Sequence, residues 1–186
     1  MHLHKVIPMG AGLGGGSSDG AFTLKLLNNL FNIGLKSDQL KDYARILGSD
    51  CAFFIENQSC YAFEKGDRFE PVPVALSGLN LVIVIPDVHV STSDAYRTIT
   101  PAIPVQPIKE LIKIPIGQWK GRLANDFEIP VFEKYPVIRE IKFALYKMGA
   151  LYSAMSGSGS AIFGLFKDVP PVVGLFRGCF VWVSPL

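Results

Sequence analysis

The stretch Pro8-Met9-Gly10-Ala11-Gly12-Leu13-Gly14-Gly15-Gly16-Ser17-Ser18-Asp19 decides how the rest of the chain is interpreted. Its five glycines permit positive φ angles and leave no Cβ between the backbone and a ligand. Successive N–H groups of such a loop can converge on an anion, and the positive end of a following helix adds to the attraction. The stretch therefore predicts a phosphate-binding loop that leads into a helix starting at Ser17, whose hydroxyl can contact phosphate or a metal ion.

Several kinds of loop compete for this stretch. The spacing Gly10-x-Gly12-x-x-Gly15 matches the dinucleotide fingerprint, but that fold needs a strand after the first helix and an acid roughly 20 residues on. A second helix is predicted there instead. A Walker loop needs a lysine beside Ser17, which the chain lacks, and a bare turn needs one or two glycines rather than five. The pattern Pro-x-x-x-Gly-Leu-Gly, found in small-molecule kinases, fits best.

A second glycine run, Met155-Ser156-Gly157-Ser158-Gly159-Ser160, joins two predicted strands. It contains more glycine than a hairpin needs, and it is either a flexible loop or a second loop facing an anion. The second interpretation is favoured, because such a loop pairs naturally with the first around a triphosphate.

Phosphoryl transfer also needs a group that orients and deprotonates the acceptor hydroxyl, and Asp50 is the candidate base. It follows the helix stop Gly48 and precedes the apolar run 52–55, so we expect its carboxylate to be partly desolvated. The alternative is an ordinary helix-capping aspartate.

The remaining pattern predicts a mixed chain without strict βαβ alternation, which favours the α+β class. Ser37 is expected to cap the second helix and Gly48 to end it. The first helix, from Ser17, carries one apolar stripe, made of Phe22, Leu26, Leu27 and Leu30. Pro71, Pro73 and Ser77-Gly78 predict a boundary between domains 1–77 and 78–186, and residues 100–115 read as irregular. Strands are predicted over 3–7, 58–63, 79–85, 151–155, 161–166 and 180–183, and helices from Ser17 and over 37–47, 127–134 and 137–148.

Composition excludes several functions. The 186 residues are 49% hydrophobic with a mean hydropathy of +0.31, which rules out a disordered tail. The net charge is +2 and no Lys/Arg cluster appears, so no nucleic-acid partner is expected. The apolar runs 79–86 and 169–186 are too short or too interrupted to span a membrane, which takes roughly 20 residues. Three scattered cysteines indicate reduced thiols in a cytoplasmic protein.

Taken together, the motifs resemble the GHMP kinase superfamily, and within it the branch that acts in the non-mevalonate isoprenoid pathway. The stretches that carry the resemblance are 7–19, 47–54, 125–128 and 155–163. The resemblance implies an α+β, two-domain GHMP kinase architecture. Residues 1–77 would be the remainder of an N-terminal ATP-binding domain of the ribosomal protein S5 domain 2-like kind, and 78–186 a ferredoxin-like C-terminal domain.

The resemblance also implies an activity, namely ATP- and Mg²⁺-dependent phosphorylation of the 2-hydroxyl of 4-diphosphocytidyl-2-C-methyl-D-erythritol. Asp50 would be the catalytic base and contact this small-molecule substrate, and Ser17 would ligate the metal. Thr92 matches a position near the erythritol hydroxyls, and Tyr96 an aromatic that stacks on cytosine or, alternatively, an ordinary surface aromatic. Asn125 and Asp126 would cap the following helix. ATP would contact Pro8, Gly10, Ala11, Gly12, Leu13, Gly14, Gly15, Gly16, Ser17 and Ser18 in the first loop and Gly157, Ser158 and Gly159 in the second.

One departure from the family is large. Its members carry a Lys-x-Asn-Leu strand and a Tyr-His segment upstream of the glycine loop, and this chain has neither. We therefore expect the C-terminal part of the kinase, with little or no activity by itself and a tendency to self-associate, for example as a homodimer. Two alternatives stay open: a GHMP kinase for another acceptor, such as homoserine or mevalonate, and a nucleotide-binding module without catalysis.

Overall fold

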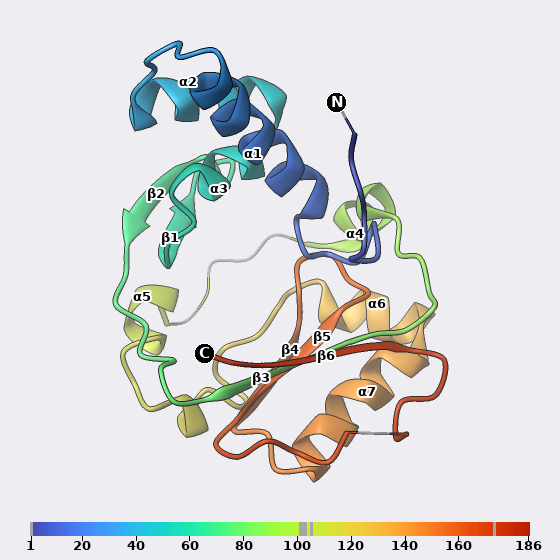
Figure 1. Ribbon diagram of the computed structural model, residues 1–186. Helices are drawn as coiled ribbons and strands as arrows, with labels where there is room; N and C mark the ends of the chain where they lie inside the picture. The colour runs from blue at the N-terminus through green and yellow to red at the C-terminus, as the bar shows by residue number, and fades with distance from the viewer. Residues whose placement is uncertain (1, 101–103, 105, 173) are drawn as a thin grey trace. The chain divides into compact units, whose positions relative to one another are not determined.

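The computed structural model describes residues 2–100, 104, 106–172 and 174–186, and the chain divides into two compact units (Figure 1). The first unit comprises Met1–Leu13 and Ala75–Leu186, and the second comprises Gly14–Val74. The end of the second unit lies close to the boundary predicted at residue 77. Residues 1–13, however, group with the C-terminal residues, so the division into domains 1–77 and 78–186 stays a prediction.

The first unit is built on a four-stranded antiparallel sheet with the order β4-β5-β3-β6. Its strands are β3 (Asn80–Ile85), β4 (Tyr152–Met155), β5 (Ile162–Phe166) and β6 (Phe180–Pro185). β3 lies in the middle because its apolar run, rich in β-branched residues, suits a strand with neighbours on both sides. The four strands predicted for this part of the chain are therefore confirmed.

This strand order is that of a ferredoxin-like sheet, in which the third strand of the chain separates the first two. Between β3 and β4, helices α6 (Glu128–Lys134) and α7 (Pro136–Lys147) cover one face of the sheet (Figure 1). Between β5 and β6, the described residues of the connection form no helix. The Pro170-Pro171 pair explains this difference, because proline lacks the N–H that a helix needs.

The core of the first unit lies between α7 and the sheet. Ile138, Ile141 and Leu145 follow helical spacing and are buried, and they share one cluster with Val82 and Val84 of β3. Pro136 occupies the first position of α7, where its missing N–H costs nothing. The two helices predicted on either side of this proline are confirmed.

Other predictions for the first unit are corrected. Residues 3–7 form no strand, because they join no ladder among the described residues, and Val6 is 70% exposed. Helix α4 (Thr92–Thr98) was not predicted, although Ser91 Oγ caps it by accepting the Asp94 N–H at 3.3 Å. Within 100–115, residues 101–103 and 105 lie outside the described residues. Helix α5 (Ile108–Leu111) occurs in this stretch, and η2 (Ile116–Gln118) follows it.

The second unit packs helices beside a short hairpin. Its elements are α1 (Gly15–Leu30), α2 (Ser37–Leu47), η1 (Ser49–Ala52), α3 (Phe53–Glu56), β1 (Cys60–Phe63) and β2 (Arg68–Pro71). The predicted helix over 37–47 and its stop at Gly48 are confirmed. Ser37, however, is the first helical residue and Lys36 the cap, whose N–H is bound by the Gln39 side chain at 3.0 Å.

The apolar stripe predicted on α1 is not the face that this helix buries. Phe22, Leu26 and Leu30 are 48%, 54% and 64% exposed, whereas Ala21 is fully buried in the cluster around Leu40 and Ile55. Small residues at this point let the neighbouring helices approach closely. In the part of the chain that the structure describes, no helix is long and apolar enough to cross a membrane.

Candidate active site

The two glycine loops meet within the first unit. The Ser156 hydroxyl donates to the Gly12 carbonyl oxygen at 2.8 Å, and the Ala161 N–H donates to the Ala11 carbonyl oxygen at 3.0 Å. The second loop is closed by its own bond from the Gly159 N–H to the Ser156 carbonyl oxygen, at 3.0 Å. The structure therefore brings residues 11–12 and 156–161 together, and their contact with ATP phosphates stays a prediction.

Gly12 is the residue that makes this close approach feasible. A Cβ on Gly12 would lie 2.1 Å from the Ser156 carbonyl oxygen, and its φ of +76° is one that side chains rarely adopt. Gly157 faces it from the other loop, where a Cβ would lie 3.1 Å from the Gly12 carbonyl oxygen. The two loops thus pack backbone against backbone at these glycines.

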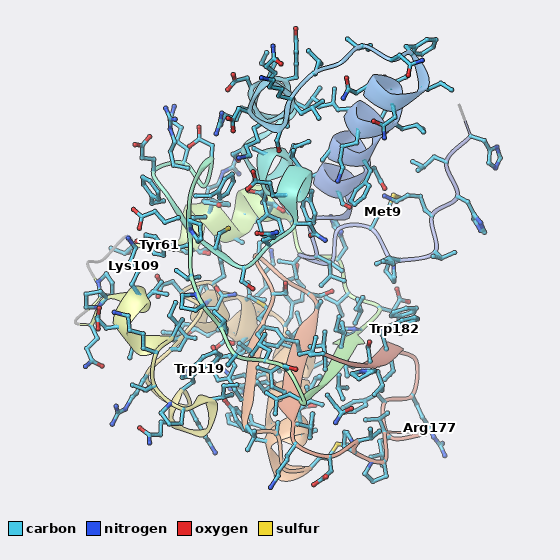
Figure 2. All side chains as sticks on the ribbon, turned by 60° about the vertical axis from the view of Figure 1, so that its left-hand side comes forward. Met9, Tyr61, Lys109, Trp119, Arg177 and Trp182 are labelled. Carbon is cyan, nitrogen blue, oxygen red and sulfur yellow. The ribbon has the colours of Figure 1, made fainter. Side chains whose placement is uncertain are left out.

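The rest of the first loop leads into α1. Gly14 caps the helix in a left-handed conformation with φ 67°, and no described side chain caps this end. The first bond of the helix runs from the Ser18 N–H to the Gly14 carbonyl oxygen at 2.9 Å, so the N–H groups of residues 15–17 precede the helical ladder. Ser17 thus lies in the first turn, although the helix begins two residues before its predicted start. Met9, near the start of the loop, is 77% exposed (Figure 2).

Two glycines of α1 offer a matched test of phosphate binding. A Cβ on Gly16 would meet nothing within 4 Å, and one on Gly20 would make ordinary contacts of 3.6 Å and 3.7 Å with Leu47 and Cys51. Both Gly16→Ala and Gly20→Ala should therefore stabilise the helix, by about 0.5–1 kcal/mol. Only Gly16→Ala should weaken ATP binding, because its methyl group enters the open space at the helix N-terminus. Equal ATP dissociation constants for both variants would contradict a phosphate site there.

The predicted substrate residues lie on α4. The Thr92 hydroxyl is 3.2 Å from the Ser158 hydroxyl, so the start of α4 contacts the second glycine loop. Tyr96 packs edge-to-face on Phe127, with ring centroids 4.9 Å apart, yet 67% of the residue stays exposed. A ring that stays largely exposed can stack on a planar base. The contact of both residues with substrate remains a prediction.

Asp50 belongs to the second unit and lies in the first turn of η1. The prediction that its carboxylate is partly desolvated is wrong, because the residue is exposed while Cys51 and Ala52 take the buried positions. The Ser49 hydroxyl is 3.5 Å from Asp50 Oδ1, and a Cβ built on Gly66 of the hairpin turn would lie 3.8 Å from the same oxygen. Asp50 is therefore accessible, with the turn of the β1–β2 hairpin beside it.

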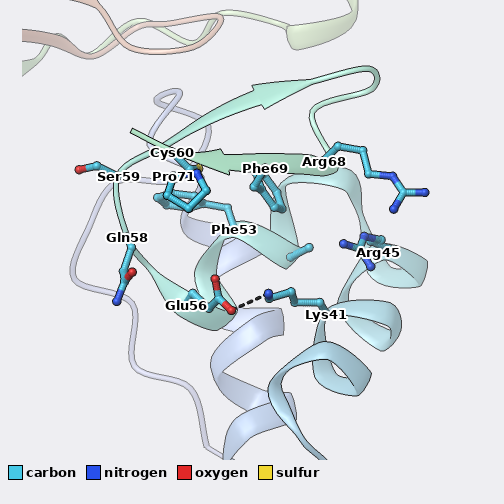
Figure 3. Close-up of a pocket in the computed structure, with 11 residues that line it drawn as sticks. Lys41, Arg45, Phe53, Glu56, Gln58, Ser59, Cys60, Arg68, Phe69 and Pro71 are labelled. Atoms are coloured by element: carbon cyan, nitrogen blue, oxygen red, sulfur yellow. Dashed lines mark ion pairs between the residues drawn. The ribbon is translucent and has the colours of Figure 1, made fainter. Parts of the chain in front are cut away.

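The second unit also holds a cavity of about 310 Å³ between α2, α3 and the hairpin (Figure 3). The ion pair between Lys41 and Glu56, 2.5 Å long, lies at this cavity, and it raises the pKa of Lys41. Residues lining the cavity include Arg45 and Phe69, but none of the residues predicted for ATP or substrate binding. The cavity is thus separate from the predicted site residues of its own unit.

Two residues that hold the second glycine loop were missed as functional candidates. Asn125 was expected to cap a helix, and its Oδ1 does accept the Phe127 N–H at 3.0 Å. Its amide nitrogen, however, donates to the carbonyl oxygens of Met155 and Gly157, each at 2.8 Å. The buried carboxylate of Glu128 accepts the Met155 N–H at 2.9 Å. The only sequence signal was the Asn125-Asp126-Phe127-Glu128 stretch of the family resemblance, because the partner lies about 30 residues away.

The described residues contain no group of three or more His, Cys, Asp and Glu side chains that could hold a metal ion. The three cysteines are all free thiols. Burial raises the pKa of the Cys60 and Cys179 thiols, which keeps them protonated near neutral pH. A divalent cation would therefore depend on phosphate oxygens, water and single side chains such as Ser17.

Comparison with known proteins gives matches along the whole chain. Models of the GHMP kinases N terminal domain and the GHMP kinases C terminal domain match residues 1–58 and 108–171. The 4-diphosphocytidyl-2-C-methyl-D-erythritol kinase of Bacteroides fragilis is 55% identical over the full chain, which covers 68% of that protein. The kinase of the same name from Parabacteroides distasonis is 49% identical, with 69% of its length covered.

Solved structures agree with these matches. A crystal structure of 4-(cytidine 5'-diphospho)-2C-methyl-D-erythritol kinase superposes with a TM-score of 0.79 at 31% identity, over 97% of this chain and 68% of that one. A homoserine kinase from Cytophaga hutchinsonii reaches a TM-score of 0.59 at 18% identity, over 98% of this chain and 68% of its own, and it shows the fold alone. The α+β GHMP kinase architecture predicted from the sequence is thereby confirmed.

Proposed function

The chain belongs to the 4-diphosphocytidyl-2-C-methyl-D-erythritol kinases of the GHMP superfamily, and on this basis we propose that it serves in phosphorylating the 2-hydroxyl of that substrate with ATP. The observation that carries the proposal is the 55% identity over the full chain, with both glycine loops and Asp50 intact. The same reaction would place the protein in isoprenoid precursor biosynthesis. GHMP kinases use ATP.

The first loop, from Pro8 to Ser18, and residues 157–159 of the second loop would hold the ATP phosphates. Support comes from the uncapped start of α1, which presents N–H groups rather than side chains, and from Gly12, whose missing Cβ lets the two loops meet. Mg²⁺ fits here, because in kinases it is held mainly by phosphate oxygens and water. Ser17 would be its protein ligand. The cation would neutralise charge on the transferred phosphoryl group.

Asp50 would act as the general base. Its exposed carboxylate can accept the proton of the 2-hydroxyl while the hydroxyl oxygen attacks the γ-phosphorus and the bond to ADP breaks. Thr92 would contact the erythritol hydroxyls, and Tyr96 would stack on the cytosine ring. The exposure of Tyr96 and the hydroxyl contact of Thr92 with Ser158 support these roles.

Two further properties belong to the proposal. We place the kinase in the cytoplasm, since its three cysteines are free and suit a reducing compartment. We also propose that this chain self-associates as a homodimer. The exposed apolar side chains of α1, such as Leu26 and Leu30, support that idea because uncovered patches of this kind favour association.

The test of the proposed reaction uses a chimera, because the chain spans 68% of its Bacteroides fragilis relative. The chimera joins the 186 residues to the part of that relative which they do not match. Release of ADP is measured with 4-diphosphocytidyl-2-C-methyl-D-erythritol, homoserine or mevalonate as acceptor. We expect turnover with the first acceptor alone. Turnover with another acceptor would refute the assigned substrate, and ATP binding without turnover on any acceptor would favour a non-catalytic module.

A further inference from the structure

The second glycine loop is held in place by side chains that lie outside it, on the segment before α6 and on α6 itself. Met155, the residue that enters the loop, is bound at both of its backbone groups: Glu128 accepts its N–H and Asn125 donates to its carbonyl oxygen. Asn125 also donates to the Gly157 carbonyl oxygen. Both hydrogens of the Asn125 amide are therefore used, and its oxygen is used by the Phe127 N–H.

The carboxylate of Glu128 is buried, with 7% of the residue exposed, and it pairs with Lys142 of α7. Burial raises the pKa of Tyr146 and of Tyr152, and the negative charge of Glu128 raises both further. The hydroxyls of these tyrosines bind the carbonyl oxygens of Ser153 and Leu123 at 3.1 Å. The Glu128 carboxylate thus lies near two largely buried phenols, in surroundings where a charge is costly to bury.

The Met155 N–H lies on the outer edge of β4, yet Met155 is buried, with 2% of the residue exposed, so a side chain rather than water accepts this N–H. A buried ion pair generally adds little net stability compared with apolar side chains of the same size. A buried carboxylate aimed at the Met155 N–H does, however, fix the backbone at the point where the strand becomes the loop.

The position of the Met155 backbone also determines the contact between the second glycine loop and the first. Residue 156 follows Met155 directly, and its hydroxyl donates to the Gly12 carbonyl oxygen while its own carbonyl oxygen lies against Gly12 Cα. Contacts this tight leave no room for Met155 to shift without moving residue 156 away from Gly12. The chain of contacts runs from Lys142 through Glu128 and Met155 to Gly12.

We propose that Asn125 and Glu128 are positioning residues that set the geometry of the phosphate-binding loops, with Lys142 holding the Glu128 carboxylate in place. The inference deepens the proposed function and rests on it. Neither residue needs to touch ATP, since both act through the backbone of Met155 and Gly157.

The test compares two double variants that remove the buried charges together. Glu128→Met with Lys142→Met removes the acceptor for the Met155 N–H, whereas Glu128→Gln with Lys142→Met keeps an oxygen there. Replacing a buried ion pair by apolar side chains of similar volume is often neutral, but the methionine pair also leaves the buried Met155 N–H without an acceptor, so it should unfold at a lower midpoint than the Glu128→Gln pair. ATP affinity is measured by titration calorimetry on the chimeric kinase, well below the lower midpoint. Asp126→Asn, at the exposed neighbouring position, is the control.

We expect the methionine pair to raise the ATP dissociation constant about tenfold, the effect of losing one hydrogen bond to a charged group. The Glu128→Gln pair and the control should bind ATP as the parent does. Equal affinity in all variants, or equal loss in both double variants, would overturn the inference. If the methionine pair does not fold, Asn125→Ala carries the same expectation, and parental affinity in that variant would overturn the inference. Failure of the parent itself to bind ATP would instead refute the proposed function.

Discussion

Replacing Asp50 with asparagine is expected to lower kcat of the chimeric kinase by about 10²–10⁴, the usual contribution of a general base. Asparagine has the same shape but cannot accept the proton of the acceptor hydroxyl. The dissociation constant for ATP should stay within about twofold of the parent, because the phosphates are assigned to the glycine loops. Folding should be unaffected, since Asp50 is exposed and its hydrogen bond to Ser49 is long, at 3.5 Å.

The matched control for this variant is Asp38→Asn on α2. Asp38 is also an exposed acid of the second unit, paired with Lys41 at 3.3 Å, and an exposed pair of this kind is worth about 0–1 kcal/mol. Its loss should change neither kcat nor ATP affinity. Unchanged turnover in Asp50→Asn would remove Asp50 from the role of base, and equal losses in both variants would point to a general effect of charge.

Gly12→Ala is expected to destabilise the first unit by about 2–5 kcal/mol. The left-handed backbone costs alanine about 1–2 kcal/mol, and forcing a methyl group into a packed contact costs about 1–3 kcal/mol more. The added Cβ would lie 2.1 Å from the Ser156 carbonyl oxygen, which belongs to backbone and cannot rotate away. The loops must therefore separate, and ATP binding should be lost together with stability. Denaturant unfolding and ATP titration measure the two effects.

Gly78→Ala separates the backbone cost from the steric one. Gly78 belongs to the same unit and has a φ of +82°, but a Cβ there would meet nothing within 4 Å. The Gly78→Ala variant should lose only about 1–2 kcal/mol of unfolding free energy, the cost of the left-handed backbone for alanine. Its ATP affinity should equal that of the parent. If Gly12→Ala and Gly78→Ala behave alike, the contact between the two loops does not determine the stability or the nucleotide affinity of this unit.

Local pattern was enough to predict most of the elements. The apolar run over 79–85 became the central strand β3, and the spacing of Ile138, Ile141 and Leu145 became the buried face of α7. Residues 3–7 show the limit of such reasoning, because a strand exists only where a partner strand bonds to it. The α1 stripe shows the same limit: spacing identifies an apolar face, but not whether the described chain covers it.

The motifs of the candidate site could be predicted from the sequence, but the side chains that hold the second glycine loop could not. Both glycine loops could be named from composition, and their contact through Gly12 and Ser156 agrees with the predicted pairing. The exposure of Asp50 could not be predicted, because it depends on which residues of the η1 turn face the core. The hydrogen bonds of Asn125 and Glu128 to the second loop could not be predicted for a different reason. Their partner, Met155, is distant in sequence and is bound through its backbone, which leaves no trace in residue type.

The most direct test of the central claim, that the two glycine loops form one phosphate site, is backbone amide exchange of the 186-residue chain with and without ATP and Mg²⁺. We expect ATP to slow exchange at residues 15–17 and 157–161, while the amides around Lys41 and Arg45 at the cavity of the second unit do not change. Protection confined to that cavity, with both loops exchanging as before, would contradict a phosphate site at the glycine loops.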